Sequence, residues 1–135
     1  MKIKLDPGAY KPVRGHATDA GLDLLAPESF WLHPGETKKI NTGVHIDIPD
    51  GYFGLITSKS GLMAKGITSR GTIDAHYLGP IYAVLHNSSD EGVLFEKGMK
   101  LTQILFIPII IPELEYVQHL GESDRGSEGF GSTGK

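Results

Sequence analysis

Two short segments carry carboxylates in settings that suit phosphate or metal chemistry. In 17–24 (ATDAGLDL), Asp19 and Asp23 are four residues apart, so an extended chain places both on one face. Hard oxygen ligands on one face suit Mg²⁺, which keeps its waters and takes one or two carboxylates plus substrate phosphates. In 71–79 (GTIDAHYLG), Asp74 lies between β-branched and aromatic residues, a setting that predicts partial desolvation and orientation toward a substrate. Turn or solvent-facing aspartates are the alternative reading of both segments, with Tyr77 in the core.

Three further segments fit anion binding. In 57–62 (TSKSGL), small residues open a short helical turn beside Lys59. In 97–105, Gln103 is a polar amide in an apolar strand, so it requires hydrogen-bond partners if buried. The end of the chain, 129–135, nearly matches the phosphate-binding pattern G-x-x-x-x-G-K-[ST], but the hydroxyl residue and the helix do not follow. We therefore reject a P-loop NTPase and expect the Gly, Ser and Thr amides to form an anion-binding nest that Arg125 assists.

Strands are the elements expected to position these residues. Apolar residues alternate with polar ones from Ile40 to Ile48, which predicts one half-buried strand, and Pro49–Gly51 forms the turn into the next. A single helical turn is expected at Ser60–Lys65, closed by Gly66. The strands expected on the same grounds are 2–5, 22–26, 30–32, 52–56, 81–85, 93–95, 101–107 and 114–117. The pattern predicts an all-β sandwich, jelly roll or barrel.

Composition excludes several classes. The chain has 135 residues, enough for one domain with one core. A net charge of −3 leaves no electrostatic footprint for nucleic acid, and the absence of cysteine excludes disulfides and thiolate sites. The longest apolar run, 104–111, is too short for a membrane span and contains Pro108. We expect a cytoplasmic protein. The last fifteen residues carry one apolar side chain, Phe130, which predicts a mobile tail.

The order of the five segments is more informative than any one of them. ATDAGLDL, SKSGL, GTIDAHYLG, KLTQILF and RGSEGFGSTG together resemble the motifs of the trimeric dUTP pyrophosphatase (dUTPase) family. The resemblance implies a jelly-roll-like distorted β-barrel at 1–120, with a flexible arm at 121–135 that closes over a neighbour's active site in a homotrimer. It also implies Mg²⁺-dependent hydrolysis of dUTP to dUMP and pyrophosphate by water attack at the α-phosphorus. That reaction keeps uracil out of DNA and supplies dUMP for dTMP synthesis.

The resemblance further assigns roles to individual residues. Asp74 orients and deprotonates the attacking water, Tyr77 packs on the deoxyribose and excludes a 2′-hydroxyl, and Phe130 stacks on uracil. Asp23 anchors a water of the magnesium ion, which the substrate phosphates mainly hold, and Asp19 positions Arg125. The substrate-binding residues implied are Lys59, Ser60, Gly61, Thr68, Gly71, Thr72, Ile73, Asp74, Tyr77, Tyr82, Gln103, Arg125, Phe130, Gly131, Ser132 and Thr133.

Several features depart from the usual family pattern, among them Thr68, which stands where many members use asparagine near the uracil. Lys59 stands where arginine is more common, which replaces a bidentate fork by a point charge. His76 stands where a small or acidic residue is more common, which places a titratable group beside Asp74.

Three other functions compete with this assignment. A dCTP deaminase has a similar fold but needs a glutamate near the third motif, and the chain has no Glu between Glu36 and Glu91. A dUTPase scaffold can also serve as a nucleotide-controlled binder of a regulatory protein partner. A purely structural jelly roll is the third alternative, and it predicts that loss of Asp74 changes no activity.

Overall fold

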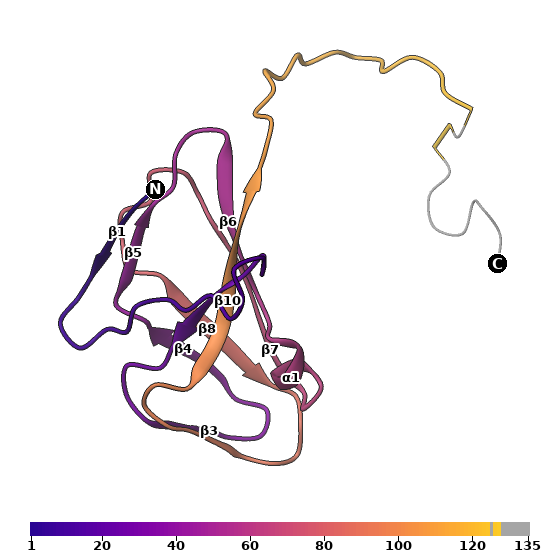
Figure 1. The fold of residues 1–135 in the computed structure, drawn as a ribbon. Coiled ribbons are helices and arrows are strands. Elements are labelled where there is room, and N and C mark those ends of the chain that lie inside the picture. The colour runs from indigo at the N-terminus through magenta and orange to yellow at the C-terminus, as the bar shows by residue number, and fades with distance from the viewer. Residues whose placement is uncertain (125, 128–135) are drawn as a thin grey trace.

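The computed structural model describes residues 1–124, 126 and 127, and strands dominate this part of the chain (Figure 1). One short helix, α1 (Ser60–Met63), accompanies them. The strands are β1 (Lys2–Leu5), β2 (Leu22–Leu25), β3 (Phe30–Leu32), β4 (Thr37–Asn41), β5 (Val44–Asp47), β6 (Tyr52–Thr57), β7 (Ile67–Ile73), β8 (Tyr82–Asn87), β9 (Val93–Phe95) and β10 (Lys100–Pro108). The expected all-β architecture with one very short helix is confirmed.

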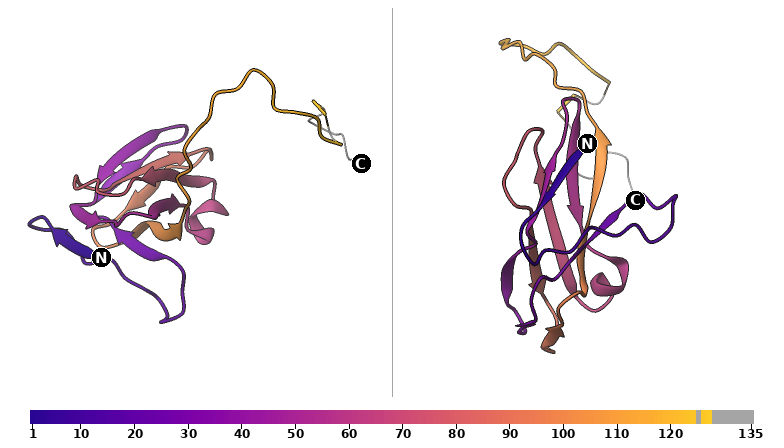
Figure 2. Two further views of the ribbon diagram at one scale, coloured as in Figure 1. Left: turned by 90° about the horizontal axis from the view of Figure 1, so that it is seen from above. Right: turned by 60° about the vertical axis from the view of Figure 1, so that its left-hand side comes forward.

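A curled antiparallel sheet forms the body of the molecule. Its strand order is β2-β10-β6-β7-β8-β4, and two smaller sheets, β1-β5 and β3-β9, flank it. Figure 2 shows the curvature of the strands and the segment after β10 leading away from the body. The long strand β10 pairs with β2 on one side and with β6 on the other, so it joins elements that are far apart in sequence.

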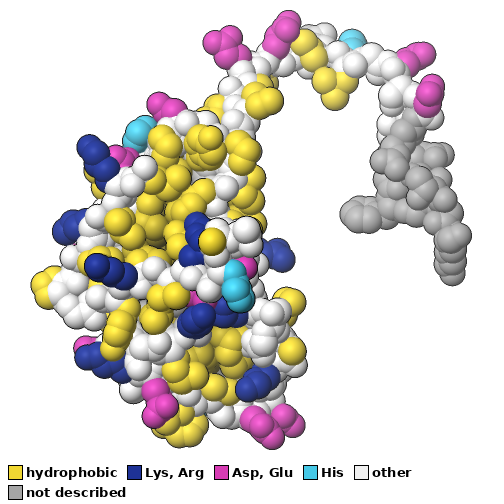
Figure 3. Space-filling view, in the orientation of Figure 1, with side chains coloured by type: hydrophobic (Ala, Val, Ile, Leu, Met, Phe, Trp, Pro, Cys, Tyr) yellow, Lys and Arg dark blue, Asp and Glu magenta, His cyan; other side chains and the backbone are white. Residues whose placement is uncertain are grey.

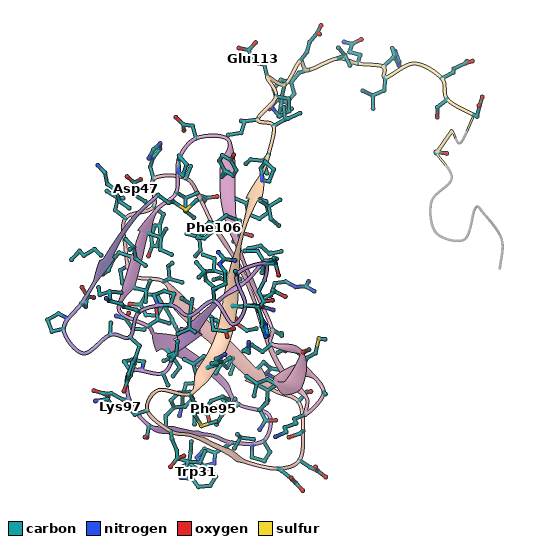
Figure 4. All side chains as sticks on the ribbon, viewed as in Figure 1. Trp31, Asp47, Phe95, Lys97, Phe106 and Glu113 are labelled. Atoms are coloured by element: carbon teal, nitrogen blue, oxygen red, sulfur yellow. The ribbon has the colours of Figure 1, made fainter. Side chains whose placement is uncertain are left out.

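Two apolar clusters make up the core. One is built on Leu24, Ile56 and Ile104 from β2, β6 and β10, and Phe106 packs against it. The other is built around Phe95 (Figure 4). Alternating strand residues point to opposite faces, so one side of each strand supplies the cluster and the other remains free for polar groups. The core therefore holds the ends of β2, β6, β7 and β10 in place.

The expected strand over 40–48 is two strands in different sheets. Gly43 has a φ of +68°, in the left-handed region that glycine adopts without steric cost, and it ends the alternation. As a result, β4 pairs with β8 whereas β5 pairs with β1. The alternation of apolar and polar residues continues across Gly43 because β4 and β5 each turn alternate residues toward the interior.

The strand expected at 114–117 is wrong. Residues 114–117 form no strand and their side chains are exposed. No strand edge of the described chain reaches this segment, so its alternating pattern has nothing to pair with. In contrast, β7 was not among the strands expected from periodicity, because its sequence ITSRGTI is polar at most positions. Within the described ranges, no helix is long and apolar enough to cross a membrane.

Candidate active site

Two neighbouring clefts lie along β7 and β8. The loop cleft, of about 360 Å³, is lined by Ile56, Arg70, Gly71, Thr72, Ile73, Asp74, Tyr77, Pro80, Tyr82 and Val84. The helix cleft, of about 410 Å³, is lined by Thr57, Ser58, Met63, Thr68, Ser69, Arg70, Val84 and His86. Arg70 and Val84 line both clefts, so the two are adjacent along the sheet. The loop cleft collects Gly71, Thr72, Ile73, Asp74, Tyr77 and Tyr82, all of which the sequence assigned to substrate.

The loop 74–80 between β7 and β8 presents the carboxylate and the aromatic ring. Asp74 directly follows β7, and its side chain is exposed in this chain. The described residues of this chain therefore do not supply the partial desolvation expected for Asp74. The Tyr77 hydroxyl donates to the Pro80 carbonyl oxygen at 3.2 Å, which orients the ring. Gly79 makes room for that ring, because a Cβ at this position would lie 2.5 Å from the hydroxyl oxygen.

A second polar group gathers where β2, β10 and the end of β6 meet. Asp23 on β2 is 5% exposed, and its two carboxylate oxygens accept hydrogen bonds from Lys59 and from Lys100, the latter at 2.7 Å. Burial alone raises the pKa of Asp23, but the two lysines outweigh it and hold the pKa below its usual value. Asp23 is thus an ionised carboxylate with two cations on it, and the cluster carries a net positive charge.

Gln103 on β10 pairs with Asp23 on β2, so it lies next to this cluster. Its amide Nε2 donates to the Ser58 carbonyl oxygen at 3.2 Å, so the hydrogen-bond partner expected for this amide is present. Gly21 allows the amide to sit there, since a Cβ on Gly21 would lie 2.2 Å from Gln103 Oε1. The glycine of the first motif therefore makes room for the glutamine of the fourth.

Asp19 and Asp23 do not share a face. Residues 16–19 form a turn in which Asp19 accepts a hydrogen bond from the His16 backbone N–H at 2.8 Å. That bond and the His16 ring hold the pKa of Asp19 below its usual value. Arg14 also donates to the Asp19 carbonyl oxygen. The expected shared face of the two carboxylates is wrong because Asp19 caps the turn at 16–19, before the extended chain of β2 that carries Asp23.

One chain keeps two groups of candidate residues apart. Lys59, Ser60 and Gly61 follow β6, whose Thr57 lies opposite Arg70 in the middle of β7. Asp74 directly follows β7, and at about 3.3 Å per residue the four residues from Arg70 to Asp74 span roughly 13 Å. Thr68 lines the helix cleft rather than the loop cleft. Five residues that the sequence assigned to substrate or phosphate lie outside the described residues: Arg125, Phe130, Gly131, Ser132 and Thr133.

Two cationic residues of the site were not among the candidates. Lys100 binds Asp23, and Arg70 lines both clefts. The sequence carried a weak signal for each, since Arg70 directly precedes the third motif and Lys100 begins the fourth. Neither signal was specific, because cations on exposed strand positions are common and only the sheet register shows what they face.

The residues present fit a magnesium ion that arrives with a triphosphate. In the part of the chain that the structure describes, no three His, Asp or Glu side chains are placed to hold a metal together. Mg²⁺ needs only one or two carboxylates when phosphates and waters complete its octahedron. Asp23 meets that need: a carboxylate offers about four acceptor sites, and the two lysines use two of them.

Comparison with known proteins agrees with this arrangement. A family model described as dUTPase matches residues 9–134. A deoxyuridine 5′-triphosphate nucleotidohydrolase from Clostridium tetani is 42% identical over 140 residues, covering 100% of this chain and 97% of its own. A mutant dUTPase of Staphylococcus bacteriophage 80alpha with dUpNHpp superposes with a TM-score of 0.88 at 34% identity, covering 99% of this chain and 98% of its own. A mutant dUTPase from phage phi11 of S. aureus, solved with a structural Mg(II) ion, gives 0.81 at 31% identity, over 88% and 97%.

The curled sheet, the loop cleft and these matches define an enzyme that hydrolyses a nucleoside triphosphate. Sequence identity near 40% over the full length and a family model over most of the chain identify the family of this enzyme. The chain belongs to the dUTPase family, and the distorted jelly-roll fold implied by its motifs is confirmed.

Proposed function

We propose that this enzyme hydrolyses dUTP to dUMP and pyrophosphate with Mg²⁺, by attack of water at the α-phosphorus. The observation that carries the proposal is the loop cleft, where Asp74 and Tyr77 share one lining with Gly71, Thr72 and Tyr82. A carboxylate at the edge of a cleft lined by strand backbone and two tyrosine rings fits a water-activating group beside a bound nucleoside. The sequence-based expectation of a cytoplasmic location stays a prediction.

The loop cleft supplies the groups that a deoxyuridine needs. The paired residues of β7 and β8 end at Ser69, so the backbone N–H and C=O groups on that side of Gly71 and Thr72 are left for the uracil edge. Tyr77, 42% exposed, offers a ring face to the sugar, and a 2′-hydroxyl packed against it has no hydrogen-bond partner. Asp74 orients the attacking water and takes its proton. Sugar selection and water activation then depend on the same short loop.

Asp23, Lys59 and Lys100 form the lysine–aspartate cluster, which with its neighbours supplies the groups that bind the phosphates. Lys59, Ser60, Gly61 and Gln103 bind phosphate oxygens or their waters, and Asp23 accepts hydrogen bonds from waters of the magnesium ion. When bound, that ion neutralises phosphate charge. Lys100 stays on Asp23 when Lys59 turns toward phosphate, so the carboxylate keeps a cationic partner. Arg125, Phe130, Gly131, Ser132 and Thr133 complete the site in this proposal.

A homotrimer explains the separation of the two groups. Residues roughly 13 Å apart along β7 can meet around one nucleotide when a second copy places its cluster against the first copy's loop cleft. The segment after β10 also exposes large apolar side chains, with Ile110 90%, Tyr116 94% and Leu120 97% exposed. Figure 3 shows hydrophobic side chains along this segment where it leaves the body. Uncovered apolar surface of this kind marks a protein–protein interface.

Pyrophosphate release tests the proposal. The enzyme with Mg²⁺ is given dUTP, and parallel reactions receive dTTP, dCTP, UTP, or dUTP with EDTA. We expect rapid release from dUTP alone and its loss with EDTA. Release from dCTP, or release from dUTP that persists in EDTA, contradicts the proposal. Tight dUTP binding without pyrophosphate release favours the alternative, a nucleotide-controlled binder of a regulatory protein partner.

A further inference from the structure

The loop 74–80 is tied to the β5 side of the molecule through two histidines. His76, inside the loop, donates its backbone N–H to the Ile48 carbonyl oxygen at 3.0 Å. Its ring nitrogens lie 3.2 Å from Asp47 Oδ1 and 3.3 Å from Asp50 Oδ1. His45 reaches the loop from β5, and its Nδ1 lies 2.8 Å from the Leu78 carbonyl oxygen. Figure 4 shows Asp47 on the β5 side of the molecule.

The partners of the two rings dictate their protonation state. A neutral imidazole carries one N–H donor and one acceptor, whereas an imidazolium carries two donors. His45 has the Leu78 carbonyl oxygen on Nδ1 and an Asp6 carboxylate oxygen 3.0 Å from Nε2. Both partners can only accept, because the pKa of Asp6 is lowered by its hydrogen bond to this ring. His76 likewise has a carboxylate oxygen on each ring nitrogen. These acceptors on both ring nitrogens favour the imidazolium form of both histidines.

Other charged groups around the two rings leave this conclusion in place. Around His45, Lys4 of β1 is its partner in the strand register and also pairs with Asp6 at 3.5 Å. Around His76, Lys2 lies opposite Asp47 in the β1–β5 register. On the loop itself, Asp74 is two residues from His76. The Leu78 carbonyl and then Asp6 raise the pKa of His45, and Asp47 followed by Asp50 raises that of His76.

His76 is held in a conformation that its side chain disfavours. Its φ is +58°, and in the described ranges it is the non-glycine residue with a positive φ. This left-handed conformation is uncommon for a residue that carries a Cβ, because the side chain approaches the backbone. The ring contacts to Asp47 and Asp50 and the backbone hydrogen bond to Ile48 stabilise His76 in this conformation.

We propose that His45 and His76, as imidazolium ions, are positioning residues that hold the loop 74–80 against β5 and the turn after it. They thereby set the places of Asp74 and Tyr77. Deprotonation removes one hydrogen-bond donor from each ring and so weakens the attachment of the loop on that side. For its effect on turnover, the inference rests on the proposed roles of Asp74 and Tyr77. The attachment of the loop 74–80 by the two histidines, here called the clamp, can be measured without substrate.

The first test measures the loop directly. Amide hydrogen exchange of residues 74–80 is followed from about pH 6 to 8.5, the range over which a histidine with a raised pKa loses its proton. After correction for intrinsic exchange, we expect protection to fall with pH in the wild type. In His76→Gly, which adopts a positive φ freely, the fall is smaller and protection is lower at pH 6. His33→Gln is the matched control, since its ring stacks on Trp31 and makes no contact with the loop. Protection that is independent of pH, or unchanged in His76→Gly, overturns the proposal.

The second test measures turnover. With dUTP and Mg²⁺, kcat of the wild type falls as pH rises through the raised histidine pKa. In His76→Gly and in His45→Gln, kcat at pH 6 is about tenfold lower, well within the roughly 100-fold that a 1 Å misplacement costs, and its high-pH decline is weaker. His33→Gln keeps the wild-type profile. Normal profiles in both variants contradict the clamp. Absence of dUTP hydrolysis in the wild type refutes the proposed function instead, and the exchange experiment then decides the clamp alone.

Discussion

The lysine–aspartate cluster allows one stability effect to be worked out in advance. Asp23→Asn keeps the shape of the side chain but removes its charge, so the two charge-assisted bonds from Lys59 and Lys100 are lost. Such bonds contribute about 1.5–3 kcal/mol each. The two lysine side chains are 28% and 45% exposed and can turn back to water, so we discount the sum of the two bonds to about 2–3 kcal/mol in total. For a chain of this size, that lowers Tm by roughly 6–12 °C.

The pH dependence of this loss has a definite sign. The pKa of Asp23 is lowered in the folded state, so its charge stabilises the fold above its ordinary pKa, and this contribution is lost as pH falls through the lowered value. Urea unfolding of wild type and Asp23→Asn at pH 7, 5, 4 and 3 measures the difference. The gap should be full at pH 7 and shrink below about pH 4. Asp90→Asn, at an exposed turn position, is the control with an expected change under about 0.5 kcal/mol. Equal stability at pH 7, or a gap that stays constant down to pH 3, refutes the reasoning.

Three further predictions address the clefts and the core. Asp74→Asn lowers kcat for dUTP by at least about 100-fold while dUTP still binds by calorimetry, because the group that accepts the proton is gone; a near-normal rate removes Asp74 as the base. Tyr77→Ala raises the kcat/KM for UTP relative to dUTP, and an unchanged ratio places sugar selection elsewhere. Gly54→Ala costs about 1–3 kcal/mol in urea unfolding, because its Cβ would lie 2.8 Å from Ile104 Cδ1 in the core. Gly71→Ala is the comparison, with nothing closer than 3.6 Å, and an equal loss in both variants contradicts the packing argument.

The strands were predictable where apolar and polar residues alternate against a buried neighbour. The ranges 2–5, 30–32 and 93–95 agree with β1, β3 and β9 in full, and the turn at Pro49–Gly51 lies where it was expected. Prediction from periodicity failed at Gly43, where a positive φ redirects the chain without changing the pattern. It also missed β7, whose inward face carries Ser69 and Gly71 between Ile67 and Ile73, so its apolar alternation is weak although the face is buried.

The candidate residues were recognisable as motifs, but their grouping was not. Nothing local in the sequence says that Gln103 lies over Gly21, because that contact arises from the pairing of β10 with β2. The same pairing brings Lys100 to Asp23. A carboxylate that a linear reading placed beside Asp19 is therefore found between two lysines, and Asp19 caps a turn of its own.

The family, the all-β class and the residue types able to do the chemistry could be read from the chain, because ordered motifs and strand periodicity are local properties. The division of these residues into two groups, roughly 13 Å apart along β7, comes from the pairing of distant strands. The fold also places two histidines so that they tie the loop 74–80 to the β5 side. The physical reason is register: which side chains meet depends on how distant strands pair, and a shift of one residue turns every side chain to the opposite face of the sheet.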